Sequence, residues 1–133
     1  MNGSYKKPVI VISNSSADPI YLQIAKQIRS QIITGVLSEG YALPSIRALA
    51  GDLQVSVITT KRAYEELEKD GYIDTVNSKG SFIAMQNPDL LRQRRMRLVE
   101  ERLAGTIVEA KQLGIGRDEL HRMLDLLFEE DVE

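Results

Sequence analysis

The sequence has 133 residues, a formal net charge of −2 and 43% apolar residues, a balance typical of a globular protein with room for one domain and a short appendage. It contains no cysteine and a single histidine, which excludes disulfides, thiolate catalysis and metal sites built from cysteines or from several histidines. No segment has the composition of a signal peptide or the length of a membrane span. We therefore expect a soluble cytoplasmic protein with no membrane segment, metal or cofactor.

The acidic groups are concentrated toward the carboxyl end of the chain. Residues 1–87 contain nine Lys or Arg and eight Asp or Glu, whereas residues 88–133 contain eight and eleven. The first part therefore has a balance of +1 and the second a balance of −3. Because binding to nucleic acid depends on a local basic face, the acidic total does not exclude it.

The first predicted elements are a strand and an amphipathic helix. The run Val9–Ile12 is too short for a helix and is β-branched throughout, which predicts a short strand. Asp18 followed by Pro19 is a helix-start pattern, with a capping carboxylate and proline at the first helical position. We expect the helix to cover residues 19–34. Its apolar stripe consists of Tyr21, Ile24, Ala25, Ile28 and Ile32.

Two short helices joined by a tight turn follow. Ser45 is a good cap for the first of them and Ser56 for the second, and each cap precedes apolar residues at helical spacing. Two such helices form a helix-turn-helix. The strand patterns over residues 72–76 and 81–84, separated by turn-forming residues 77–80, predict a hairpin directly after the second helix. A hairpin in that place is a wing.

The second helix of this motif has a face that suits DNA. Its inward positions are Thr60, Ala63, Tyr64 and Leu67. The amino-terminal end of a recognition helix enters the major groove. At that end of this helix, the face opposite the inward positions is therefore the one expected to meet DNA. There Lys61 and Arg62 suit phosphates or guanine edges. Val57 and Ile58 suit thymine methyl groups.

Residues outside this helix complete the set. Ser45 and Ser56 lie where helix-start amides meet phosphate oxygens, and Arg47 can reach the DNA backbone. Gly80 allows a close backbone approach to the minor groove, with the cation of Lys79 beside it. Each of these residues alone is better explained as an ordinary surface or capping residue, and it is their combination in this order that favours DNA binding.

The remaining residues predict two helices that suit dimerisation. Pro88 marks the start of this tail, residues 89–113 predict one long helix, and residues 113–116 a break before a last helix. Two-fold pairing would bring two winged helices to the two half-sites of a palindrome. The candidate dimer-core residues are Leu98, Leu103, Ile107, Leu120, Leu124, Leu127 and Phe128. The alternative is a monomer in which both helices fold back on the wing domain.

Four motifs follow one another over about half of the chain: residues 19–24 (PIYLQI), 43–50 (LPSIRALA), 55–73 (VSVITTKRAYEELEKDGYI) and 79–84 (KGSFIA). Together they resemble the winged-helix domain of the GntR family of regulators. The short two-helix tail resembles its YtrA-like subgroup, which lacks a large effector-binding domain. The resemblance implies that Arg47, the start of the recognition helix and the wing glycine contact DNA. The candidate DNA-binding residues are thus Ser45, Arg47, Ser56, Val57, Ile58, Thr59, Lys61, Arg62, Lys79 and Gly80.

The sequence also departs from the family. Many relatives carry arginine directly after the cap of the recognition helix, where this chain has Val57. A guanine contact is lost with that arginine, so we expect a more A·T-rich operator. The resemblance implies a repressor of a transporter operon or of its own operon. The arginines at positions 92, 94, 95 and 97 are expected to form a solvated face, with contact to phosphates as the alternative.

We therefore expect a mainly α (α+β) fold, with a winged helix-turn-helix over residues 1–87 and a helical dimerisation region over residues 88–133. The expected function is sequence-specific regulation of transcription by a homodimer on double-stranded operator DNA. A protein-interaction module that has lost DNA binding is the second hypothesis. An enzyme is disfavoured because phosphate-binding glycine loops and spaced metal ligands are missing. An unidentified small-molecule effector would have to act by changing the distance between the two DNA-binding winged helices of the dimer.

Overall fold

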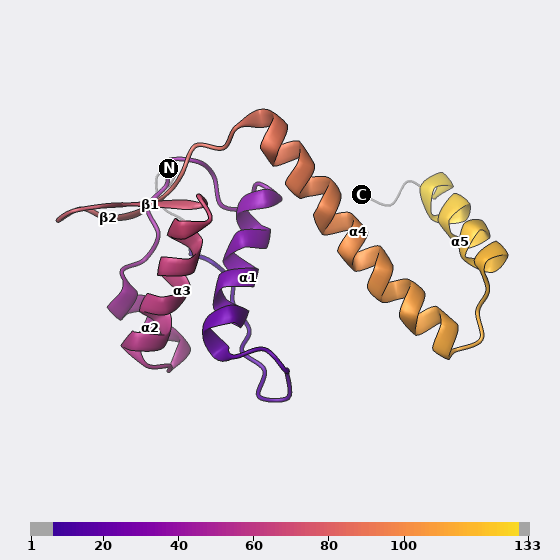
Figure 1. Cartoon of the computed structure of the whole chain (residues 1–133), viewed down its shortest axis with the longest axis horizontal. Coiled ribbons are helices and arrows are strands. Elements are labelled where there is room, and N and C mark those ends of the chain that lie inside the picture. Colours follow the sequence, from indigo (N-terminus) through magenta and orange to yellow (C-terminus); the bar gives the residue numbers. More distant parts are fainter. Residues whose placement is uncertain (1–6, 131–133) are drawn as a thin grey trace. The chain divides into compact units, whose positions relative to one another are not determined.

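The computed structural model describes residues 7–130, and in this part of the chain five helices and one hairpin follow one another (Figure 1). The elements are α1 (Ile20–Ile33), α2 (Ile46–Leu53), α3 (Val57–Lys69), β1 (Ile73–Val76), β2 (Gly80–Ile83), α4 (Pro88–Gln112) and α5 (Arg117–Glu129). The expected mainly α fold, a winged helix-turn-helix followed by helices, is confirmed.

Two compact units lie on either side of the bond between Arg95 and Met96. The first unit holds α1, α2, α3, the hairpin and the first two turns of α4, and the second holds the rest of α4 and α5. The functional boundary expected between residues 87 and 88 stays a prediction. Within residues 7–130, no helix combines the length and the apolar character needed to cross a membrane.

The core of the first unit lies between α1, α2 and α3, which pack together in Figure 1. The α1 stripe is buried as predicted apart from Tyr21, which is half-buried, and Ile24 and Ile28 are fully inaccessible. The other helices contribute Leu49, Ala50, Thr60, Ala63, Tyr64 and Leu67. Burial of each large apolar side chain stabilises the fold by about 1.5–3 kcal/mol. This core therefore holds α3 firmly against α1 and leaves its other face outward.

The turn between α2 and α3 is tight because Gln54 adopts the left-handed conformation, with φ 58° and ψ 45°. Directly after it, the Val55 amide donates to the carbonyl of Ala50 at 3.0 Å. The predicted caps of the two helices, Ser45 and Ser56, are both confirmed. These three features fix α3 relative to α2 as a helix-turn-helix requires.

The wing is a hairpin with a third short stretch of chain beside it. β1 and β2 pair antiparallel, with Val76 opposite Gly80 next to the turn. Ala42 lies opposite Phe82, and residues 40–43 exchange backbone hydrogen bonds with β2. The segment that leads into α2 is therefore joined to the wing by backbone hydrogen bonds.

The strand predicted at Val9–Ile12 is wrong, because this segment pairs with side chains and not with another strand. The amide group of Gln31 accepts from the Val9 N–H at 3.1 Å and donates to the Val9 carbonyl at 2.7 Å. The same pair of hydrogen bonds joins Gln27 to Val11 and Gln23 to Ser13. Four helical residues rise about 6 Å and two extended residues about 6.6 Å, so the glutamines and the extended segment stay in register over all three pairs.

The predicted capping of α1 by Asp18 is also wrong. Helix α1 begins at Ile20 with Pro19 in the N-cap position, and no side chain caps its first amides. Asp18 therefore lies one residue too early to cap. Its carboxylate instead accepts a hydrogen bond from Nζ of Lys26 at 2.8 Å.

The second unit has little core of its own. Helix α5 begins after Gly116, whose amide donates to the Glu119 carboxylate at 3.0 Å. Among residues 96–130, Ala110 alone is buried. A unit built this way leaves its apolar side chains to be covered from outside.

Candidate nucleic-acid interface

The amino-terminal end of α3 presents apolar side chains to solvent. Val57 is 42% exposed and Ile58 is 80% exposed. The preceding Ser56 hydroxyl accepts from the Thr59 N–H at 3.0 Å and donates to the Thr59 hydroxyl at 2.7 Å, so its proton and one of its two lone pairs are used within the cap. Lys61, one turn further on, is also exposed. This end of α3 thus offers methyl groups and a cation on one surface, which suits thymine methyls and a phosphate.

Arg62 is held in place by a side chain of α1. Its guanidinium carbon lies 3.9 Å from the centroid of the Tyr21 ring, and Nη2 donates to the Tyr21 hydroxyl at 3.3 Å. The guanidinium stays exposed, so its other N–H groups remain available. Tyr21 was expected only in the apolar stripe, and no sequence signal links two positions 41 residues apart.

The start of α2 is fixed from α3. The buried Tyr64 hydroxyl donates to the carbonyl of Pro44 at 2.7 Å. Ser45 then caps α2 by accepting from the Ala48 N–H at 3.0 Å. Because the hydroxyl oxygen acts as the acceptor, its proton can be donated outward. Arg47, in the first turn of α2, is exposed.

The tip of the wing is a tight turn that requires glycine. The Lys79 N–H donates to the Val76 carbonyl at 2.9 Å, Ser78 has φ 69° and Gly80 has φ 105°. A Cβ at position 80 would meet nothing within 4 Å, so backbone conformation and not space favours glycine there. The side chain of Lys79 is exposed at this tip.

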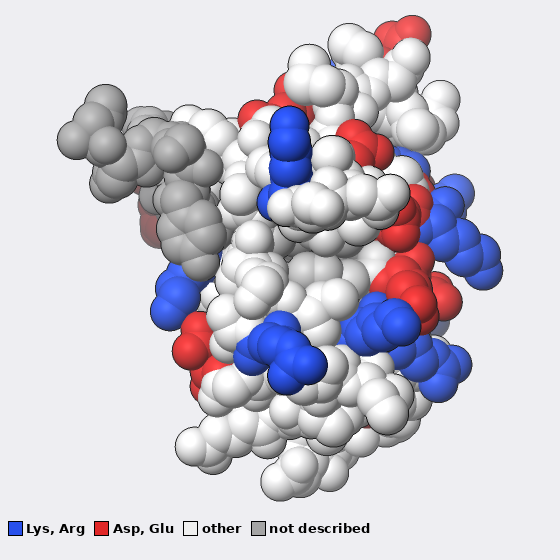
Figure 2. Space-filling view, turned by 90° about the vertical axis from the view of Figure 1, so that its left-hand side faces the viewer, with Lys and Arg blue, Asp and Glu red and all other residues white. Residues whose placement is uncertain are grey.

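Basic side chains are dispersed on this part of the molecule. Figure 2 shows the left-hand side of the view in Figure 1, where the hairpin and α2 lie. The lysines and arginines stand there as separate groups with acidic groups between them. Binding to a polyanion would therefore depend on individually placed cations and helix-start amides, and not on a uniform positive surface.

Known proteins are similar to this chain in sequence and in fold. Residues 20–83 match the model of a family described as bacterial regulatory proteins, gntR family. Over 116 residues the chain is 32% identical to the HTH-type transcriptional repressor YtrA of Bacillus subtilis. This alignment covers 87% of this chain and 89% of YtrA. This chain belongs to the gntR family.

Solved structures extend the similarity of this gntR-family chain to its C-terminal helices. A GntR family transcriptional regulator from Listeria monocytogenes matches 90% of this chain and 99% of its own, with a TM-score of 0.68 and 30% identity. A transcriptional antiterminator from Listeria monocytogenes EGD-e matches 90% and 89%, with a TM-score of 0.62 and 37% identity. The chain is a DNA-binding transcriptional regulator of the YtrA-like type, and its relatives are regulators, not enzymes.

The solvated face expected for four arginines of α4 is wrong for Arg94, which is half-buried, and incomplete for Arg95, which is exposed but hydrogen-bonded to the first unit. Arg94 donates through Nη2 to the carbonyl of Asp70 at 3.0 Å. Arg95 donates through Nε to the carbonyl of Ile33 at 2.9 Å. Two guanidinium groups of this gntR-family regulator are thus used inside its first unit, at the carboxyl ends of α3 and α1. The arginines at positions 92, 95 and 97 are exposed as expected.

The predicted dimer-core residues remain accessible to differing degrees in the single chain. Phe128 is 78% exposed and Leu103 is 53% exposed. Ile107, Leu124 and Leu127 are exposed as well, and Leu98 and Leu120 are half-buried. Met96, Val99 and Leu126 are exposed apolar residues that the prediction omitted.

Proposed function

We propose that this chain is a homodimeric, sequence-specific repressor that binds a palindromic operator and controls a transporter operon or its own operon. The observation that carries the proposal is the amino-terminal end of α3, where Val57 and Ile58 are exposed beside Lys61. Exposed apolar side chains at that position gain by meeting thymine methyl groups in a major groove. The similarity to a protein named as a transcriptional repressor supports the direction of control.

The candidate residues divide into two kinds of contact. Arg47, Lys61 and Lys79 are exposed cations that would bind phosphates and position the protein. Val57 and Ile58 would contact bases and favour an A·T-rich operator. Selection of bound sequences from a random pool tests this preference, and recovery of G·C-rich half-sites would contradict it.

Operator binding is tested by fluorescence anisotropy with the gene's own upstream DNA, unrelated DNA as control, and a series of salt concentrations. We expect preference for the upstream DNA and affinity that falls with salt, because phosphate contacts release counterions. Arg47→Ala should weaken binding about tenfold or more, whereas Arg92→Ala, an exposed arginine of α4, should change it less than about twofold. An RNA of the same sequence serves as competitor, in view of the relative named an antiterminator.

A folded protein that shows no preference over unrelated DNA would contradict the proposal. That outcome would favour the second hypothesis, a winged helix that binds a protein partner.

Pairing of two copies is proposed to cover the exposed apolar side chains of the second unit. Phe128 and Met85 are both 78% exposed, but Met85 lies in the first unit. In light scattering, Phe128→Glu should shift the protein toward monomer and weaken operator binding, while Met85→Glu should leave the mass unchanged. A wild-type monomer would contradict the dimer and support the alternative with folded-back helices. A small-molecule effector and a cytoplasmic location stay predictions.

A further inference from the structure

Helix α4 starts on the first unit with its own cap. Pro88 occupies the first helical position, and the side-chain oxygen of Asn87 accepts from the amides of Asp89 and Leu90 at 2.9 and 3.2 Å. A capped start with proline at its first position is a well-ordered helix end. The direction of α4 from this point depends on what holds its first two turns against the unit.

Arg94 holds the first turns of α4 against the first unit through three partners. Its guanidinium lies over the ring of Tyr72, 4.2 Å from the centroid. Nη1 donates to the side-chain oxygen of Gln86 at 2.8 Å, and Nη2 donates to the carbonyl of Asp70, the C-cap of α3, at 3.0 Å. Gln86 is itself fixed, since its amide nitrogen donates to the carbonyls of Ala84 and Gly71. A planar guanidinium with a stacked face and two directed hydrogen bonds allows one orientation.

Arg95 also holds α4 against the first unit, but its partner lies on a different core helix, α1. Its Nε donates to the carbonyl of Ile33, the last residue of α1, at 2.9 Å. The carboxyl end of a helix has unpaired carbonyls and a partial negative charge, so a guanidinium is favoured there on both counts. Consecutive residues of α4 therefore bind the carboxyl ends of two different core helices.

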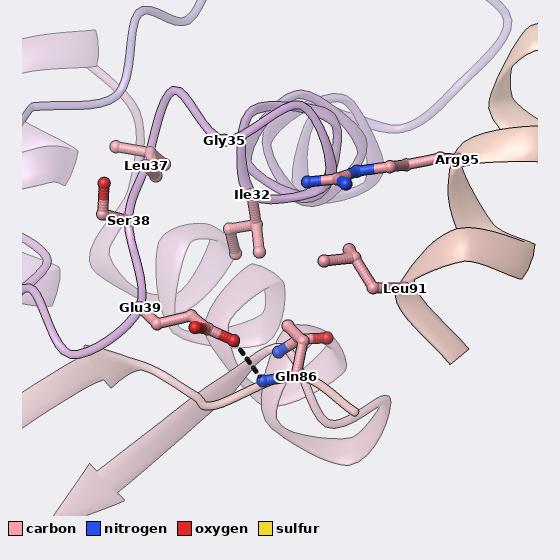
Figure 3. Close-up of a pocket in the computed structure, with 8 residues that line it drawn as sticks. All are labelled: Ile32, Gly35, Leu37, Ser38, Glu39, Gln86, Leu91 and Arg95. Carbon is pink, nitrogen blue, oxygen red and sulfur yellow. Dashed lines mark hydrogen bonds between the residues drawn. The ribbon is translucent and has the colours of Figure 1, made fainter. Parts of the chain in front are cut away.

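Apolar packing alone does not fix this part of α4. An open pocket of about 210 Å³ lies between α4, the end of α1 and the loop that follows it, and Figure 3 shows the residues that line it. Leu91 points toward Ile32 across the pocket, and the guanidinium of Arg95 closes its upper side in this view. Because this pocket opens to solvent, apolar contact there is partial, and the two arginines add directed hydrogen bonds that hold the helix.

We propose that Arg94 and Arg95 are positioning residues that fix the direction in which α4 leaves the DNA-binding unit, and thereby set the half-site spacing that the dimer accepts. The inference rests on the proposed homodimeric operator binding. α4 is one continuous helix from Pro88 to Gln112. A change in the direction of its first turns would therefore change the position of the DNA-binding unit relative to the second copy, which is proposed to pair through the later residues of the chain. The half-site spacing that such a dimer accepts is set by the distance and orientation between its two winged helices.

The test compares operators whose half-sites are moved apart or together by one to three base pairs. Wild type should prefer its best spacing over a change of two base pairs by about tenfold or more, and the variant R94Q/R95Q by less than about threefold. Affinity for a single half-site duplex and the dimer mass should stay unchanged. The matched control, R92Q/R97Q, alters two exposed arginines of the same helix and should keep the wild-type preference. An unchanged spacing preference in R94Q/R95Q would overturn the proposal, as would an equal loss on the half-site.

A second readout does not depend on DNA. The sequence has no cysteine, so cysteines introduced at the exposed residues Glu68 and Glu101 can carry two spin labels, with labelled chain diluted in unlabelled chain. The distance distribution should broaden in R94Q/R95Q and stay as in wild type in R92Q/R97Q. If the glutamine variant does not fold, R94K/R95K keeps the charge but loses the planar fork and should broaden the distribution as well. An unbroadened distribution overturns the positioning role, whereas failure of wild type to bind any operator contradicts the proposed function alone.

Discussion

The ring of Tyr21 in α1 supports the guanidinium of Arg62 in α3, with 3.9 Å between the guanidinium carbon and the ring centroid. Its hydroxyl also accepts from Nη2 at 3.3 Å. Cation–π contacts at exposed sites contribute about 0.5–1 kcal/mol, so the effect on folding is small. The larger effect is on binding, because a long side chain that is already ordered loses less freedom when it meets DNA.

Tyr21→Leu should weaken operator binding about two- to tenfold, since ordering one long side chain costs about 0.5–1.5 kcal/mol. Tyr21→Phe, which keeps the ring, should lose less. Anisotropy on the same operator measures both. In an Arg62→Ala background, Tyr21→Leu should have no further effect on affinity. Losses that simply add would show that Tyr21 acts independently of Arg62.

The local features of the fold could be predicted from the sequence. Ser45 and Ser56 cap helices as expected, because a cap depends on the few residues around it. The recognition helix was correctly oriented from the helical period of Thr60 and Leu67, both buried. Asp18 shows the limit of such signals, since a shift of one residue at the helix start turned a capping carboxylate into a partner of Lys26.

Contacts between distant positions could not be predicted. Arg94 and Arg95 are charged residues in a helix of mostly exposed ones, and nothing in their neighbourhood indicates backbone carbonyl partners 24 and 62 residues earlier. The extended segment at Val9–Ile12 was interpreted as a strand for the same reason. Its signal was in the partner helix, where glutamine recurs every four residues from Gln23 to Gln31.

Gly80→Ala should destabilise the wing, because position 80 has φ 105°, a conformation that costs a residue with a Cβ about 1–2 kcal/mol. The free energy of unfolding from urea denaturation measures this. The matched control is Gly51→Ala, in the interior of α2 with nothing within 4 Å of the added Cβ, which should stabilise the protein by about 0.5–1 kcal/mol. If both substitutions changed the free energy of unfolding in the same direction, the role assigned to the backbone conformation at the wing tip would be contradicted.

Gln27→Ala should lower the free energy of unfolding by about 1–2 kcal/mol, because it removes both hydrogen bonds to Val11 and each contributes about 0.5–1.5 kcal/mol. Hydrogen exchange of the Val11 amide should become faster. Gln27→Glu keeps the acceptor for that amide but loses the donor, so exchange should stay slow while stability falls part of the way. Gln93→Ala, an exposed glutamine of α4, serves as the control. Unchanged exchange at Val11 in Gln27→Ala would show that the glutamine pairing does not protect this segment.

Ser45 separates a capping role from a DNA-binding role. Its hydroxyl accepts from the Ala48 N–H at 3.0 Å, and loss of this cap in Ser45→Ala should cost about 1 kcal/mol of stability. Ser45→Asp keeps an acceptor at the cap and adds a charge that the helix start favours, so its stability should match wild type. If position 45 faces phosphates, the same carboxylate repels DNA, and binding should be weaker in Ser45→Asp than in Ser45→Ala.

The order of the two affinities decides between the roles, because a purely structural serine would give the reverse order. Repulsion between exposed charges is screened by salt, so the deficit of Ser45→Asp relative to Ser45→Ala should shrink as the ionic strength rises. The control is Asn87→Asp, which introduces a carboxylate at the cap of α4, where Asn87 accepts from the Asp89 amide. That variant adds the same charge to the chain, so equal losses of affinity in Asn87→Asp and Ser45→Asp would attribute the effect to net charge and not to the position of Ser45.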